Sequence, residues 1–161
     1  MSIPALDEAA EAMKGAALEA VDPGRAIHRH VRREGDWLLV GKRRYGVYDY
    51  ERVLVIGGGK ASVPMAEAIV DLAGDHVTAG VIVTKDGHAG GWSAPGFEVI
   101  EAGHPVPDEH SVRGAEAVAE LAARATERDL VLCLISGGGS ALLTRPVDGV
   151  SLDDLQAVTD G

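Results

Sequence analysis

The feature that most constrains this chain is an alternation of short apolar runs with longer helix-like segments, which begins at Val53. Continuous apolar strands separated by helical connections of about a dozen residues or more are typical of a parallel sheet covered on both faces. The alternation therefore predicts an α/β fold with a mainly parallel, Rossmann-like sheet and helices on both faces. The predicted strands are residues 53–56, 80–84, 97–101 and 130–135, and the predicted helices are residues 62–73, 109–126 and 152–158.

The part of the chain before Val53 has a different pattern. Residues 6–20 are rich in Ala, Glu and Leu and predict a helix, which Asp22-Pro23-Gly24 ends before a second helix over residues 25–33. Residues 37–40 and 45–48 are separated by a turn that contains Gly41, and they predict a short hairpin. We therefore expect an N-terminal helical pair and a hairpin in front of the parallel sheet.

Composition narrows the classes of partner. Fifteen basic and 25 acidic residues give a net charge of −10, and such a surface repels the phosphates of nucleic acids. The longest apolar runs, such as residues 130–135, are far shorter than the roughly 18 residues of a membrane span, and the N-terminus lacks the basic start of a secretory signal. We expect no nucleic-acid or membrane partner and a cytoplasmic location. The oligomeric state stays open, a homo-oligomer included.

The single cysteine, Cys133, lies inside the apolar run of residues 130–135. This position favours a small buried side chain over a nucleophile or a metal ligand. With one cysteine, a disulfide framework or a cysteine-based metal site cannot form within one chain.

Four turns follow the four predicted strands. In an open parallel sheet, ligands bind outside the carboxyl ends of the strands, so we expect a ligand site where these turns meet. The turns are residues 57–62, 84–88, 102–108 and 136–140.

The first turn places three glycines directly before a predicted helix. Backbone N–H groups of Gly57-Gly58-Gly59 can approach an anion at the positive end of the helix dipole, and Lys60 adds a mobile cation. The turn is neither a Walker A loop nor a strict dinucleotide fingerprint, because Ala61 and Ser62 stand where those patterns need other residues. Close packing of a strand against a helix also explains such glycines, and both interpretations stand.

The last turn, Ser136-Gly-Gly-Gly-Ser140, repeats the pattern. Consecutive glycines suit a loop that adopts positive φ or admits a ligand, and the two hydroxyls add donors. The alternative is a tight turn without a ligand. A nucleophile elbow is not indicated, because Ser140 lacks the second glycine of that motif.

The two middle turns carry further polar candidates. His104 and Asp108 frame the rigid segment Pro105-Val-Pro107. Lys60 and Lys85 are the only basic residues at strand ends after Val53, which makes them candidates for meeting a polyanion. A structural histidine and a solvated loop are the alternative interpretations of these turns.

Three blocks of sequence together resemble the N-terminal domain of the glycerate 2-kinase family, the DUF4147/MOFRL type whose members are often labelled hydroxypyruvate reductases. The blocks are Val55-Ile-Gly-Gly-Gly-Lys-Ala-Ser62, Gly103-His-Pro-Val-Pro-Asp108 and Ile135-Ser-Gly-Gly-Gly-Ser-Ala-Leu142, in the family's order. The resemblance implies Mg²⁺-dependent transfer of the γ-phosphoryl group of ATP to the 2-hydroxyl of D-glycerate.

The resemblance also implies roles for individual residues. Lys60 matches the family's catalytic lysine, and His104 and Asp108 belong to a family motif. Together with Lys85, which is a candidate because of its position at a strand end, they are the candidate substrate contacts. Independently of the resemblance, Asp86, Asp108 and Asp148 are candidate metal contacts, with no pattern that favours one. The expected phosphate- and nucleotide-binding residues are Gly57, Gly58, Gly59, Ser62, Ser136, Gly137, Gly138, Gly139 and Ser140.

The chain departs from the family in its length. Family members continue with sequence that completes the first domain and with a C-terminal MOFRL domain. We therefore expect residues 1–161 to form a single incomplete domain, the N-terminal part of a glycerate kinase-like domain. Whether this chain is active by itself stays open. Two other hypotheses stand beside the kinase. One is an NAD(P)H-dependent hydroxypyruvate reductase, although a clean dinucleotide fingerprint is missing. The other is a non-catalytic fragment that binds nucleotide or phosphate.

Overall fold

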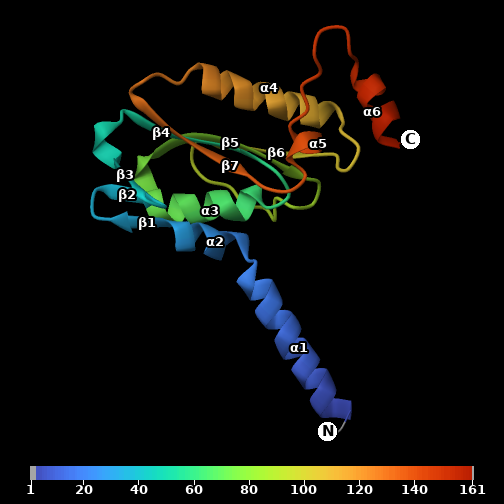
Figure 1. Cartoon of the computed structure of the whole chain (residues 1–161). Coiled ribbons are helices and arrows are strands. Elements are labelled where there is room, and N and C mark those ends of the chain that lie inside the picture. Colours follow the sequence, from blue (N-terminus) through green and yellow to red (C-terminus); the bar gives the residue numbers. More distant parts are fainter. Residues whose placement is uncertain (1–2, 161) are drawn as a thin grey trace.

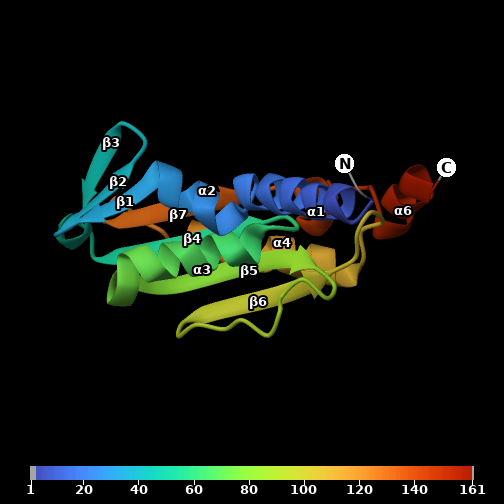
Figure 2. The ribbon, with the colours of Figure 1, turned by 90° about the horizontal axis from the view of Figure 1, so that it is seen from below.

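A four-stranded parallel sheet forms the centre of the computed structural model, which describes residues 3–160. Its strands are β4 (Arg52–Gly58), β5 (Val77–Lys85), β6 (Phe97–Ala102) and β7 (Asp129–Ile135), in the spatial order β6-β5-β4-β7. Helix α3 (Ser62–Ala73) packs against one face and α4 (Glu109–Ala123) against the other (Figure 1). Figure 2 shows the strands side by side behind α3. The predicted α/β fold with helices on both faces is confirmed.

Alternating side chains of the strands fill two cores, one under each helix. Val55, Ile82 and Leu134 belong to the core on the α3 side, whereas Leu54 and Val83 belong to the core on the α4 side. Because β4 lies inside the sheet, both of its faces are covered, and this explains its continuous apolar sequence.

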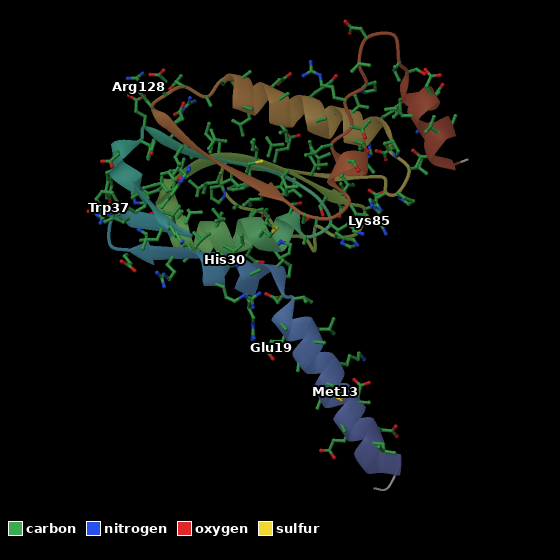
Figure 3. The ribbon with its side chains drawn as sticks, viewed as in Figure 1. Met13, Glu19, His30, Trp37, Lys85 and Arg128 are labelled. Atoms are coloured by element: carbon green, nitrogen blue, oxygen red, sulfur yellow. The ribbon has the colours of Figure 1, made fainter. Side chains whose placement is uncertain are left out.

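The N-terminal part differs from the prediction at the end of its second helix and in its hairpin. Helix α1 (Ile3–Ala20) extends away from the sheet, with Met13 and Glu19 along it (Figure 3), and α2 (Pro23–His30) begins after Asp22, whose carboxylate accepts from the N–H of Arg25 at 2.7 Å. The predicted second helix over residues 25–33 is wrong at its end, because the chain continues as strand β1 (Val31–Glu34).

Strand β1 pairs antiparallel with β2 (Trp37–Val40), which pairs antiparallel with β3 (Arg43–Gly46). The predicted hairpin is therefore part of a three-stranded sheet, and residues 47–49 form a short 3₁₀ turn instead of strand. Val31 and Leu38 are buried in the core on the α3 side, so tertiary packing outweighs the helical tendency of residues 31–33.

The prediction that Cys133 is buried is wrong. Strand β7 is at the edge of the sheet, and α4 packs against β4, β5 and β6. Alternate side chains of β7 therefore face a side with little cover, and Val131 and Ile135 are 36% and 59% exposed there. Cys133, which lies between them, is exposed as well.

Two helices complete the chain. Helix α4 ends at Ala123, three residues before the predicted end, and the N–H and hydroxyl of Thr126 donate to the Asp129 carboxylate at 2.7 and 3.0 Å. The short helix α5 (Gly139–Leu142) was not predicted. Helix α6 (Leu152–Asp160) corresponds to the predicted helix over residues 152–158. A second 3₁₀ turn covers Gly74–His76. Within residues 3–160, none of the helices has the length and apolar character needed to cross a membrane.

Candidate functional site

The carboxyl ends of the strands bring the four predicted turns to one edge of the sheet. In the parallel register, Gly58 lies beside both Val83 and Ile135, and Lys85 lies beside Ala102. Figure 3 shows Lys85 at this edge, which is also the end of the sheet where α5 lies in Figure 1. Residues 57–62, which begin with the last two residues of β4, are called the first glycine loop, and residues 136–140, which follow β7, are called the second glycine loop.

The glycines of the first loop allow close packing. A Cβ at Gly57 would stand 2.8 Å from the Leu134 carbonyl oxygen, and a Cβ at Gly58 would overlap the Leu143 side chain. Gly59 has φ +132°, and a Cβ there would overlap Ser136. These contacts favour the packing interpretation of the three glycines.

The N–H groups of the first loop already have acceptors inside the chain. Gly59 donates to the Val83 carbonyl at 3.1 Å, and Lys60 donates to the Gly137 carbonyl at 2.9 Å. The next two N–H groups, those of Ala61 and Ser62, donate to the Ser136 hydroxyl and to the Gly59 carbonyl at 3.0 and 3.1 Å. What this loop offers a ligand is therefore the exposed side chain of Lys60.

Ser62 belongs to the protein interior. Its side chain is fully buried, and its hydroxyl lies 2.7 Å from the Gly59 carbonyl oxygen and 2.9 Å from that of Val83. A single O–H serves these two acceptors. The hydroxyl thus fixes the start of α3.

The second loop has free donors. Among residues 3–160, no acceptor receives a hydrogen bond from the backbone N–H groups of residues 137–140. Gly138 adopts the left-handed conformation, with φ +92° and ψ 0°. Gly137 and Ser140 are exposed, and the space where a Gly137 Cβ would stand is open. This loop can donate several hydrogen bonds to an anion.

Lys60 and His104 meet at Gly138. A Cβ at Gly138 would stand 2.9 Å from Nε2 of His104 and 3.4 Å from Cγ of Lys60. Three turns that are far apart in sequence thus contribute a lysine, an imidazole and free N–H groups to one place. The structure brings these predicted residues together.

His88, a polar residue of the turn after β5, makes a contact that the sequence did not predict. Its Nδ1 lies 3.3 Å from the Lys60 carbonyl oxygen. Because a carbonyl oxygen only accepts, Nδ1 is the donor and carries a proton. The only sequence signal was the position of His88 in a glycine-containing loop after a strand.

Asp108 caps helix α4. Its carboxylate accepts from the Ser111 N–H at 2.9 Å, and its own N–H donates to the Ser111 hydroxyl at 3.1 Å, which forms a capping box. Burial alone would raise the pKa of Asp108, but hydrogen bonds from Ser111 and from the Gly103 N–H outweigh it and lower that pKa. The carboxylate remains ionised, and its hydrogen bonds within the chain hold the turn that carries His104.

The remaining candidates lie further from Gly138. Lys85 is half-buried at the end of β5, and Asp86 and Asp148 are exposed in loops. A magnesium ion is commonly held by one or two carboxylates together with substrate phosphates. Across the described residues 3–160, no three His, Cys, Asp or Glu side chains cluster as a metal site.

The fold and the edge define a class of protein. The chain folds as an open α/β protein, and its glycine loops and basic side chains lie outside the carboxyl ends of the strands. Anion- and nucleotide-binding proteins have this arrangement. Residues 9–161 match the family described as "Domain of unknown function (DUF4147)", and the chain belongs to this family. This confirms the resemblance drawn from the sequence.

Relatives with names give the family its context. The chain is similar to the glycerate 2-kinase of Pyrococcus horikoshii, with 44% identity over 146 residues, which are 91% of this chain and 32% of that protein. A crystal structure of a Pyrococcus horikoshii OT3 protein matches with a TM-score of 0.81 and 42% identity, over 96% of this chain and 34% of that one.

A crystal structure of glycerate kinase from Thermotoga maritima matches with a TM-score of 0.75 and 35% identity, over 98% of this chain and 34% of that one. The chain therefore spans about a third of the length of the relatives it matches.

Proposed function

We propose that this chain supplies the nucleotide- and substrate-binding part of a glycerate 2-kinase, which transfers the γ-phosphoryl group of ATP to the 2-hydroxyl of D-glycerate. The observation that carries the proposal is the meeting of Lys60 and His104 at Gly138, beside the free N–H groups of residues 137–140. Similarity to the Pyrococcus and Thermotoga kinases supports it.

Phosphoryl transfer requires positioning and neutralisation of charge more than covalent chemistry from the protein. The hydroxyl oxygen of glycerate forms a bond to the γ-phosphorus, the bond to the bridging β–γ oxygen breaks, ADP leaves, and the hydroxyl proton passes to water. In this proposal, the N–H groups of residues 137–140 and the Lys60 ammonium bind the phosphoryl oxygens, where negative charge is concentrated.

His104 and Lys85 are the proposed contacts for the glycerate carboxylate. His104 lies beside Gly138, and Lys85 ends the neighbouring strand β5. Asp108 supports His104 by capping α4 at the end of the same turn. Magnesium would supply further charge neutralisation together with the phosphates of ATP, and no residue of this chain is assigned to it.

A phosphorus NMR time course with ATP, Mg²⁺ and D-glycerate tests the proposal. The samples are this chain and a chimera in which it replaces the matching N-terminal third of the Pyrococcus horikoshii kinase. We expect 2-phosphoglycerate from the chimera and none from its Lys60→Ala variant. A folded chimera that forms no product would contradict the proposal. Oxidation of NADH by hydroxypyruvate without ATP would support the reductase hypothesis instead.

A further inference from the structure

The two glycine loops are joined beyond the ends of their strands. The Ser136 N–H donates to the Gly58 carbonyl at 3.1 Å, and the Lys60 N–H donates to the Gly137 carbonyl at 2.9 Å. A third bond runs from the Ala61 N–H to the Ser136 hydroxyl oxygen at 3.0 Å. Only this third bond depends on a side chain.

The Ser136 hydroxyl accepts from a backbone N–H at the start of α3. Ala61 occupies the N-cap position of α3, and α3 has no side-chain cap of its own. In a capping box the side chain at N3 accepts from the N–H of the N-cap residue, but N3 of α3 is Pro64, which carries no side-chain acceptor. The Ala61 N–H is accepted instead by Ser136, 75 positions away.

Gly59 makes room for this contact. It has φ +132°, and a Cβ on it would overlap the Ser136 hydroxyl. By contrast, the Ser140 side chain makes no hydrogen bond within residues 3–160 and is exposed. The two serines of the second loop therefore have different surroundings.

We infer that Ser136 is a positioning residue, whose hydroxyl anchors the Lys60 loop to the second glycine loop. Through Ala61 it holds the backbone of Lys60, which carries the ammonium-bearing side chain, beside residues 137–140. The inference rests on the proposed function and assigns Ser136 a role other than direct contact with phosphate.

Amide hydrogen exchange of this chain without nucleotide tests the anchor independently of any kinase activity. In Ser136→Ala we expect the Ala61 amide to exchange at least about fivefold faster, since one hydrogen bond is lost. Ser136→Thr keeps the acceptor and should restore the slow exchange. Ser93→Ala, in an exposed loop, is the matched control and should leave Ala61 unchanged.

The kinase chimera then separates positioning from binding. A positioning role predicts that Ser136→Ala lowers kcat about tenfold or more with little change in the KM for ATP, and that Ser136→Thr restores kcat. Unchanged Ala61 exchange in Ser136→Ala would overturn the inference, as would a raised KM with unchanged kcat. If Ser136→Ala does not fold, Ser136→Cys, whose thiol is a weaker acceptor, should give intermediate exchange. Exchange equal to wild type in Ser136→Cys would also overturn it.

Discussion

The two glycine loops have similar sequences but different structural roles. In the first loop, residues 57–62, four successive N–H groups are bonded inside the chain, and the glycines allow Leu134, Leu143 and Ser136 to approach. In the second loop, the N–H groups of residues 137–140 have no acceptor within residues 3–160. The difference shows that two similar runs of glycines can differ in packing, and that the neighbouring acceptors decide whether the backbone donors remain for a ligand.

The largest expected effect comes from the one side chain that the first loop offers. Lys60→Ala should lower kcat of the kinase chimera about 10²–10³-fold, because a preorganised donor at the transferring phosphoryl group is lost. Lys14→Ala, which removes an exposed lysine on α1, is the control. Steady-state kinetics measure both. Equal kcat values for Lys60→Ala and wild type would show that the first loop takes no part in catalysis.

Alanine at one glycine of each loop tests the packing difference. Gly59→Ala should lower the free energy of unfolding by about 2–4 kcal/mol, because Gly59 has φ +132° and its Cβ would overlap Ser136. Gly137→Ala should change it by less than about 0.5 kcal/mol, because its Cβ meets open space. Urea unfolding measures both. Similar losses of unfolding free energy in Gly59→Ala and Gly137→Ala would contradict the proposed difference in packing between the two loops.

The amino ends of β4 and β7, opposite the glycine loops, carry an ion pair whose contribution to stability can be tested by changing the pH. Arg52 donates to both carboxylate oxygens of Asp129 at 2.8 and 2.7 Å, and this ion pair together with hydrogen bonds from Thr126 holds the pKa of Asp129 far below its usual range. A lowered pKa adds stability above the unfolded value of about 4, and this stability is lost as the pH falls through the folded value.

Asp129→Asn should therefore be less stable than wild type at pH 7, and the difference should shrink below about pH 4. Urea unfolding across this pH range measures it. The exchange of the Ala61 amide by local opening should stay as in wild type, because the Ser136 anchor lies at the other end of the strands. If the difference in unfolding free energy between Asp129→Asn and wild type did not change with pH, the ion pair would not explain the stability.

The smallest effect is expected at the turn that carries His104. Asp108→Ala should lower the free energy of unfolding by about 1 kcal/mol, because α4 loses its N-cap. Asp108→Asn keeps an acceptor and should lose less. Thermal unfolding distinguishes the two. Equal losses would mean that the capping hydrogen bond contributes little.

The sequence predicted the elements that depend on local pattern and missed those that depend on distant neighbours. The parallel sheet followed from apolar runs alternating with helices, and the four turns met at one edge as expected. Strand β1 was missed because its pairing with β2 and the burial of Val31 are tertiary effects. Cys133 was misjudged because an apolar run does not show that its strand lies at an edge.

Within the candidate site, the sequence named Lys60, His104 and the second loop, which the structure brings together. It did not reveal that the Ser136 hydroxyl accepts from Ala61, because that acceptor lies 75 residues away. The contact of His88 with the Lys60 carbonyl was missed for a similar reason, since it joins the turns after two different strands.

A titration of the ¹⁵N-labelled chain with ATP and Mg²⁺, followed by the backbone amide resonances, tests the central claim most directly. We predict that the largest shifts occur at residues 137–140, with smaller shifts at residues 59–62, whose N–H groups keep their internal acceptors. The largest shifts at residues 59–62, or no saturable shift in either loop, would contradict the account.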